Sequence, residues 1–207
     1  IRTRRPRALY LNPTLQNPTT RTIPVARRME TATRRLADGR FITPMAAVAG
    51  AVADDILTAM VARGPLTRAY VNNGGDIALH LAPGASFSLG VVERPEAPTL
   101  FGATRLAAEG PVRGVATSGW RGRSFSLGIA CSVTILAIDA TSADAAATLV
   151  ANAVDLPDHP AVARVAACDL DPQSDLGARP VTRAVGPLGG DDIARALDCG
   201  ARTAEEF

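Results

Sequence analysis

Three short segments hold residues whose types and spacing could bind a phosphate-bearing ligand. The first is the string Asn72-Asn73-Gly74-Gly75-Asp76. Adjacent glycines let backbone N–H groups approach a ligand closely, and the carboxylate of Asp76 could accept a hydrogen bond from a sugar hydroxyl or a ring nitrogen. The same string also fits an ordinary β-hairpin turn, which needs no ligand. The residues alone leave both interpretations open.

The second segment is Thr117-Ser118-Gly119, which is followed by Arg121 and Arg123. Two hydroxyl groups beside a glycine form a loop rich in hydrogen-bond donors, and the two guanidinium groups could neutralise a phosphate. A polar loop between two strands is the alternative interpretation. Ser118 is not a candidate hydrolase nucleophile, because the G-x-S-x-G pattern is absent around it and the chain has only two histidines.

The third segment places Asp144 and Thr148 four residues apart on a predicted helix, so that their side chains share one face. One carboxylate and one hydroxyl suit a hard cation that keeps several waters and takes further oxygens from a phosphate. The alternative is helix capping, because Asp144 follows Thr141 by three residues, as in a capping box.

A mixture of helices and strands must position these segments. Residues 44–62 predict a buried helix, with Thr43 as its N-cap and Pro44 at its first position. We expect the inaccessible side chains of this helix to include Ala47, Val48, Ala51 and Val52. The turn at residues 72–76 predicts a hairpin between strands at residues 69–71 and 77–81.

The remaining elements alternate in type along the chain. Further strands are predicted at residues 86–92, 103–108, 114–117, 124–130, 132–138 and 180–185. Further helices are predicted at residues 25–36, 142–154, after Pro160 and at 191–197, with Gly200 shortly past the end of the last one. Neighbouring strands interrupted by helices predict an α+β fold, in which helices pack on one face of an antiparallel or mixed sheet.

Composition and charge narrow the class of protein. Hydrophobic residues make up 47% of the 207 residues, which predicts a folded chain. All 22 basic residues are arginines, so no lysine can act as a general base or a phosphate clamp. Residues 1–40 hold ten arginines against Glu30 and Asp38, and they predict a basic N-terminal arm and short helix ahead of a single domain at 41–207.

Several partner classes are not expected. The arm contains one aromatic residue, Tyr10, and so lacks the stacking pattern of nucleic-acid-binding chains. The three cysteines are widely spaced and the histidines few, which argues against a disulfide framework and a zinc site. No apolar run predicts a membrane span, so we expect a cytoplasmic protein that binds a small molecule and could form a homo-oligomer.

Five segments resemble motifs of the ApbE superfamily in their residues and their order, and they resemble those of its shorter ApbE-like branch more closely. These segments are residues 44–50, 72–77, 117–119, 132–134 and 143–148. ApbE proteins are Mg²⁺-dependent flavin transferases that attach FMN from FAD to a threonine of a partner protein, and their fold is related to the tunnelling fold. The resemblance implies that Asp144, Thr148 and the backbone carbonyl of Ala49 are magnesium ligands. It also implies a flavin site, FAD or FMN, lined by Asn72, Gly74, Gly75, Asp76, Thr117, Ser118 and Gly119, with Arg123 close by.

The sequence departs from the transferases at two places. They carry a lysine where this chain has Gly50, and a His-x-x-Asp-Pro-x-x-Gly stretch that this chain lacks. Arg123 stands where the closer branch leads us to expect a histidine, so the catalytic residues are unknown. Three interpretations follow: a protein that binds a flavin or nucleotide, a Mg²⁺-dependent FAD:protein FMN transferase, and a non-catalytic oligomeric module or binder of another metabolite.

Overall fold

The computed structural model describes residues 24–92 and 99–207. Its helical elements are α1 (Pro24–Ala37), the 3₁₀ turn η1 (Pro44–Ala47), α2 (Val48–Val61), α3 (Ala140–Ala153), α4 (Ala167–Leu170) and α5 (Gly190–Glu205). Its strands are β1 (Arg68–Asn73), β2 (Asp76–Leu81), β3 (Ser86–Val92), β4 (Leu100–Ala107), β5 (Gly114–Ser118), β6 (Val133–Ala137), β7 (Val162–Ala166) and β8 (Pro180–Val185).

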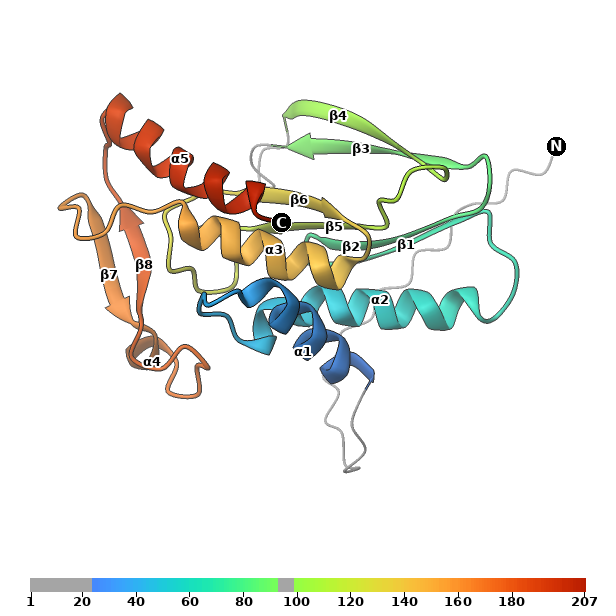
Figure 1. The fold of residues 1–207 in the computed structure, drawn as a ribbon, viewed down its shortest axis with the longest axis horizontal. Coiled ribbons are helices and arrows are strands. Elements are labelled where there is room, and N and C mark those ends of the chain that lie inside the picture. Colours follow the sequence, from blue (N-terminus) through green and yellow to red (C-terminus); the bar gives the residue numbers. More distant parts are fainter. Residues whose placement is uncertain (1–23, 93–98) are drawn as a thin grey trace.

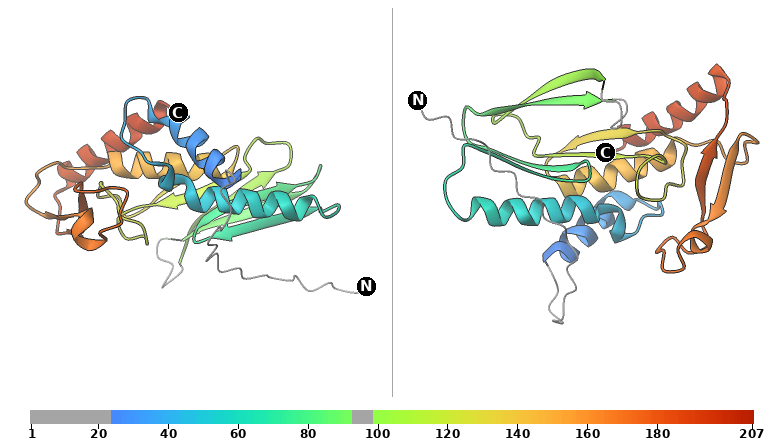
Figure 2. Two further views of the ribbon diagram at one scale, coloured as in Figure 1. Left: turned by 90° about the horizontal axis from the view of Figure 1, so that it is seen from below. Right: turned by 180° about the vertical axis from the view of Figure 1, so that it is seen from behind.

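A four-stranded antiparallel sheet in the order β1-β2-β5-β6 forms the centre of the fold. Helix α2 packs across β1 and β2, and α3 packs across β5 and β6, on the same face of the sheet (Figures 1 and 2). The opposite face packs against the β3–β4 hairpin through Leu79, Val115 and Leu106. The predicted α+β fold, with helices on one face of an antiparallel sheet, is confirmed.

The two-residue period of the strands explains this layering. Ala78 of β2 and Ala116 of β5 face the helices and are fully buried, whereas Leu79 and Val115, one residue away, face the β3–β4 hairpin. Small residues on the helix face let α2 and α3 lie close to the sheet. The abundance of alanine in the chain therefore reflects this close packing of helices on the sheet.

Helices α2 and α3 are linked by reciprocal hydrogen bonds, because each helix has an aspartate that accepts from backbone N–H groups of the other. Asp54 of α2 accepts hydrogen bonds from the first N–H groups of α3, at Ala140 (3.2 Å) and Thr141 (2.9 Å), and from the Thr141 hydroxyl (2.6 Å). Asp144 of α3 accepts from the N–H of Gly50, in the first turn of α2 (2.9 Å). Each helix thus satisfies N–H groups that the other leaves without an intrahelical partner.

Helix α1 packs on the outer side of this helix pair. Met29 and Ala32 contact a cluster formed by Ala47, Ala51 and Ala145, so α1 touches both α2 and α3. Figure 1 shows α1 crossing in front of the two helices. The predicted helix at residues 25–36 is confirmed, while residues 1–23 of the predicted arm lie outside the described residues.

The predicted helix at residues 44–62 is confirmed as η1 followed by α2, but its burial is only partly as expected. Ala47 and Ala51 are fully inaccessible, whereas Val48 and Val52 are half-buried, because α1 covers only one side of α2. Thr43 precedes the first turn without capping it, and its hydroxyl contacts the carboxylate of Asp175 instead.

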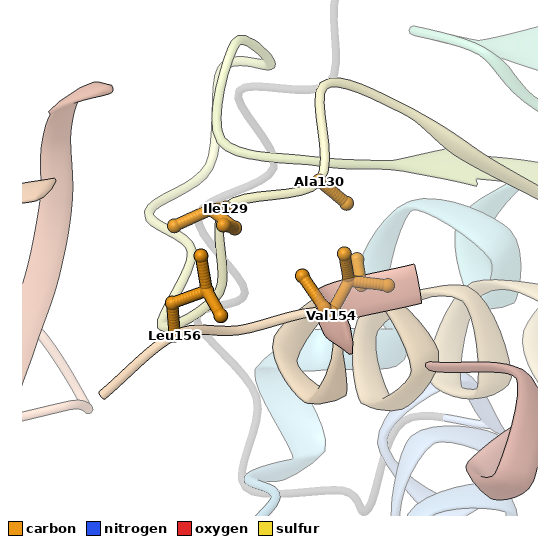
Figure 3. Packing of buried hydrophobic residues seen from close by; sticks show 6 residues of the cluster. Ile129, Ala130, Val154 and Leu156 are labelled. Atoms are coloured by element: carbon orange, nitrogen blue, oxygen red, sulfur yellow. The ribbon is translucent and has the colours of Figure 1, made fainter. Parts of the chain in front are cut away.

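The predicted strand at residues 124–130 is wrong. This segment is irregular, because its backbone groups bond mainly to the end of α3, and a single bond, from the N–H of Thr182 to the carbonyl of Ser126 (2.9 Å), joins it to β8. The N–H of Leu127 donates to the Asn152 side chain (2.9 Å), and that of Ile129 donates to the carbonyl of Val154 (2.8 Å). Figure 3 shows the side chains of Ile129 and Ala130 directed toward Val154 and Leu156.

Two predictions near the C-terminus are also corrected. The segment after Pro160 forms strand β7, not a helix, because β8 offers it an antiparallel partner. Helix α5 continues through Gly200 to Glu205. Gly200 does not end the helix but allows close packing, since a Cβ at this position would lie 2.3 Å from a methyl carbon of Val154 at the end of α3.

By length and composition, the helical stretch Pro44–Val61 is apolar enough to cross a membrane. Its contacts are those of a core helix: it packs on the sheet, on α1 and on α3, and it carries the buried carboxylate of Asp54.

The hydrogen bonds that Asp54 accepts from α3 give a first prediction. Replacing Asp54 by alanine leaves three buried donors of α3 without an acceptor, so the free energy of unfolding should fall by about 1–3 kcal/mol. Asp55→Ala is the matched control, because the half-buried neighbour makes none of these bonds, and it should change stability by less than about 0.5 kcal/mol. Chemical denaturation of both variants measures the difference; an equal loss would contradict the role of Asp54.

Candidate functional site

The turn between β1 and β2 is a tight two-residue hairpin. Asn73 and Asp76 pair across it, and Gly74 and Gly75 occupy the two central positions with φ angles of 76° and 117°. Both angles lie in the region that favours glycine. The side-chain oxygen of Asn72 accepts a hydrogen bond from the N–H of Gly75 (2.9 Å). Asn72 therefore closes the turn, in addition to any contact it makes with a ligand.

The two glycine-containing segments lie side by side, because β2 and β5 are neighbours in the sheet. The backbone N–H of Thr117 donates to the carboxylate of Asp76 (3.3 Å). Arg123 reaches back across the hairpin, where a Cβ on Gly74 would lie 3.0 Å from a terminal nitrogen of its guanidinium group. One continuous surface thus includes Gly74 and Asp76 from the hairpin and Thr117 and Arg123 from the second segment. About 40 residues separate the two segments in the chain.

Asp144 does not cap its own helix. The N-cap of α3 is Asp139, whose side chain accepts from the N–H of Ser142 (2.6 Å). The carboxylate of Asp144 bonds instead to the N–H groups of Ala49 and Gly50 at the start of α2. The capping box with Thr141 is therefore wrong, and the Thr141 hydroxyl is bound to Asp54.

Each of the three predicted metal ligands lies at, or bonds to, residues 46–50, where α2 begins. The carbonyl oxygen of Ala49 accepts a hydrogen bond from the Asn73 side chain (3.2 Å). The hydroxyl of Thr148 lies 3.5 Å from the carbonyl oxygen of Ala46, one turn earlier in the chain. With Asp144 bonded to the same turn, one carboxylate, one hydroxyl and two carbonyl groups surround the N-terminus of α2. We call the surface formed by these groups, Asp76 and the hairpin turn the Asp76–Asp144 cluster.

Burial raises the pKa of both carboxyl groups in this cluster. Asp144 is 9% exposed, and its burial, together with the nearby charge of Asp76, raises its pKa to about 7, against the opposing effect of the bonds from Gly50 and Ala49. Burial raises the pKa of Asp76 to about 6, although the bond from Thr117 and the charge of Arg123 act in the opposite direction. When ionised, the two carboxylates repel each other and are poorly hydrated. A bound cation would therefore stabilise their ionised forms.

Two predicted site residues contribute less directly. Ser118 and Gly119 follow Thr117 in the chain, but none of their described contacts is with Asp76 or Asp144. Gly119 is buried against the carbonyl groups of Ala130 and Cys131. Their part in ligand binding stays a prediction.

Three residues of the cluster were not given a role from the sequence. The side chain of Asn73 donates a hydrogen bond to the Ala49 carbonyl. Asn73 is two residues from Val71 on β1, so both face the helices, and this alternation could have identified Asn73 from the sequence. The hydroxyl of Thr134 bonds to that of Thr117 (2.9 Å). At Gly50 a Cβ would lie 2.2 Å from the carbonyl oxygen of Ala140, so the side chain that the transferases carry at this position has no room here.

Both histidines of the chain lie away from the cluster. His80 contacts the carbonyl oxygen of Leu66 (3.0 Å), and His159 contacts the backbone of Ala161 and the carboxylate of Asp192. Among the described residues, no group of three or more His, Cys, Asp or Glu side chains is placed to hold a metal ion. A cation at the cluster would therefore depend on backbone and hydroxyl oxygens as well as on carboxylates.

The comparisons with known proteins identify the family of the chain. A family model described as AbpE bacteria matches residues 6–207, which is almost the whole chain. The chain belongs to this family. It is also similar to the UPF0280 proteins of three archaea.

The UPF0280 protein of Methanothermobacter thermautotrophicus is 36% identical over 135 residues, which cover 65% of this chain and 50% of that protein. That of Methanopyrus kandleri is 36% identical over 118 residues, or 57% of this chain and 46% of that protein. That of Methanothrix thermoacetophila is 39% identical over 114 residues, or 55% and 46%. The chain spans about half the length of the curated relatives it matches, and together these similarities support an ApbE-related family.

The close contact at Gly50 gives a second prediction. Gly50→Ala should reduce the free energy of unfolding by about 1–3 kcal/mol or more, because the added methyl group meets the backbone of Ala140. Gly190→Ala is the control, since it also adds a methyl group to a helix but meets nothing within 4 Å. Thermal melts of both variants measure the effect; a neutral Gly50→Ala would show that α2 and α3 are packed less closely than described.

The raised pKa values give a third prediction. An acid with a raised pKa in the folded state binds more protons when folded than when unfolded, so its contribution to stability is present below its unfolded pKa and is lost as the pH rises. For Asp144 the loss extends from about pH 4 to about pH 7. Urea titrations in the presence of a chelator should show stability declining over this range. Asp144→Asn should flatten the decline, and a profile parallel to that of the wild type would contradict the prediction.

Proposed function

We propose that this protein binds a flavin or a related phosphate-bearing nucleotide together with Mg²⁺ at the Asp76–Asp144 cluster. The observation that carries the proposal is the convergence of the Ala49 carbonyl, the Asp144 carboxylate and the Thr148 hydroxyl at the start of α2, next to the hairpin turn. These residues come from two distant parts of the chain, α2 and α3, and the hairpin turn comes from a third. Neither the capping of α3 nor the hairpin turn requires them to meet.

The chemistry of these groups fits a hard divalent cation. Carboxylate, hydroxyl and carbonyl oxygens are the ligands that Mg²⁺ prefers, and it keeps several waters that a phosphate can replace. A carbonyl oxygen has two lone pairs, so the bond from Asn73 leaves the Ala49 carbonyl able to bind a cation. A positive charge beside Asp76 and Asp144 would also lower the free-energy cost of burying their ionised carboxylates.

The surrounding residues fit a nucleotide in complementary ways. Arg123 is exposed, always charged and placed over the turn, where its planar guanidinium group could bind a phosphate with two hydrogen bonds. Asp76 could accept a hydrogen bond from a sugar hydroxyl or from the N–H of a ring. The Thr117 and Thr134 hydroxyl pair is exposed on the Thr117 side and adds polar contacts.

The transferase activity of ApbE proteins lies beyond this proposal. Neither histidine is near the cluster, and Gly50 has no room for the lysine that the transferases carry. Arg123 cannot act as a general base, because it stays protonated. We therefore propose binding, in a cytoplasmic protein, and assign no catalytic residue.

Two substitutions separate metal binding from helix stabilisation. Asp144→Asn should weaken Mg²⁺-dependent binding of FAD by more than about tenfold, because a neutral amide loses the charge that attracts the cation. Thr148→Val keeps the side-chain shape and removes only the hydroxyl, so it should weaken the same binding with little effect on folding. Calorimetric titration of the full chain with FAD, with and without Mg²⁺, measures both effects.

Asp54→Asn is the matched control. It alters the other buried carboxylate between α2 and α3 and should lower thermal stability, yet leave FAD binding unchanged. If wild type and the Asp144 and Thr148 variants bind FAD equally with and without Mg²⁺, the metal role is wrong and Asp144 serves only to hold α2.

A further inference from the structure

A separate basic crevice lies between α1 and the first turn of α3. Its volume is about 330 Å³. The residues that line it from α1 are Arg27, Arg28, Thr31, Ala32 and Arg35, and those from the start of α3 are Asp139, Thr141 and Ser142. This volume lies at the lower end of the range for small-molecule sites and suits a compact ligand.

The three arginines of the crevice are concentrated on one side of α1. Arg28 and Arg35 are seven residues apart, so they lie two turns apart on one face, and Thr31 lies between them. Two turns of helix separate these two charges by about 10 Å along the axis, a span that a phosphate ester or a diphosphate can bridge. The crevice therefore concentrates positive charge on one side of α1.

The protein supplies little negative charge to balance these arginines. Among the described residues, Asp139 is the one acid that lines the crevice, and its carboxylate already caps α3 through Ser142. The Asp54 carboxylate lies beside it, where it accepts hydrogen bonds from the N–H and the hydroxyl of Thr141. Elsewhere, arginines pair with acids, as Arg40 does with Glu206 and Arg164 with Asp155. In the described part of the chain, no ion pair involves an arginine of the crevice.

Hydrogen-bond donors accompany the charge. The guanidinium group of Arg28 contacts the hydroxyl of Thr58 at 3.4 Å, which positions it at the crevice while leaving most of its five N–H donors available. Thr31 and Ser142, which carry hydroxyl groups, line the same crevice. Two or more guanidinium groups and two hydroxyls around a hollow of this size match the oxygens of a phosphate, which arginine binds through paired hydrogen bonds.

We propose that this crevice binds the phosphate groups of a second small molecule, at a site distinct from the Asp76–Asp144 cluster. Ser142 and Asp144 are two residues apart on α3, so their side chains point about 200° away from each other around the helix axis. Asp144 bonds to the start of α2, whereas Ser142 lines the crevice beside α1. One helix thus separates the two sites, and the volume of the crevice suits a phosphate ester or a diphosphate rather than a whole dinucleotide.

Inorganic pyrophosphate is a direct probe of this site. The full chain is titrated with pyrophosphate in a calorimeter, in the presence of a chelator so that no divalent cation contributes at the other site. The wild type should bind one equivalent saturably. Arg28→Gln combined with Arg35→Gln should weaken binding by about 100-fold, since each charge-assisted contact accounts for about tenfold.

Two further variants control for net charge and for the other site. Arg183→Gln combined with Arg202→Gln removes the same charge from exposed positions on β8 and α5 and should leave the affinity within about twofold. Asp144→Asn should bind pyrophosphate as the wild type does.

Several results would overturn the proposal. They are the absence of saturable binding to the wild type, an equal loss in the two double variants, and a loss of pyrophosphate binding in Asp144→Asn. Binding of a single-stranded oligonucleotide without any response to pyrophosphate would also overturn it, because the basic surface would then serve a nucleic-acid backbone.

Discussion

The structure depends on the mutual contact between the first turns of α2 and α3. Each helix places one aspartate on the free N–H groups of the other, Asp54 on α3 and Asp144 on α2. The helices can approach closely enough for this exchange only because residue 50 is glycine, which lies against the backbone of Ala140. Buried carboxylates are costly unless they are hydrogen-bonded, and here backbone donors that would otherwise lack partners stabilise them.

The same contact builds the candidate site. Asp144 must reach the start of α2 to stabilise it, and this brings its carboxylate beside the Ala49 carbonyl and above the sheet where Asp76 emerges from β2. Fold stability and the proposed ligand binding therefore depend on the same side chain, Asp144. This explains why the site combines raised pKa values with satisfied hydrogen bonds, and why tests of function need Asp54 as a control for stability.

Local patterns predicted most of the elements and much of the cluster. Alternating apolar residues, the Asn/Gly turn and the apolar helical segments correctly indicated β1, β2, β3, α2 and α3, because these features act within a few residues. The predicted caps of the two helices, at Thr43 and Thr141, were wrong. The failures share one cause. Residues 124–130 and the segment after Pro160 have sequences compatible with more than one structure, and their form follows from the groups that bond to them, the end of α3 in one case and β8 in the other.

The sequence by itself determined the α+β class, the hairpin turn and the pairing of Asp144 with Thr148 on one helix face, because each depends on spacing along the chain. Only the tertiary structure decided what Asp144 does. Spacing favoured a bond within α3, whereas close packing at Gly50 offered the carboxylate the N–H group of Gly50, in the first turn of α2. The basic crevice beside α1 was equally undetermined, since its arginines line a hollow only because α1 packs against the start of α3. Long-range packing sets the surroundings of a side chain, and those surroundings decide its charge, its partners and its chemistry.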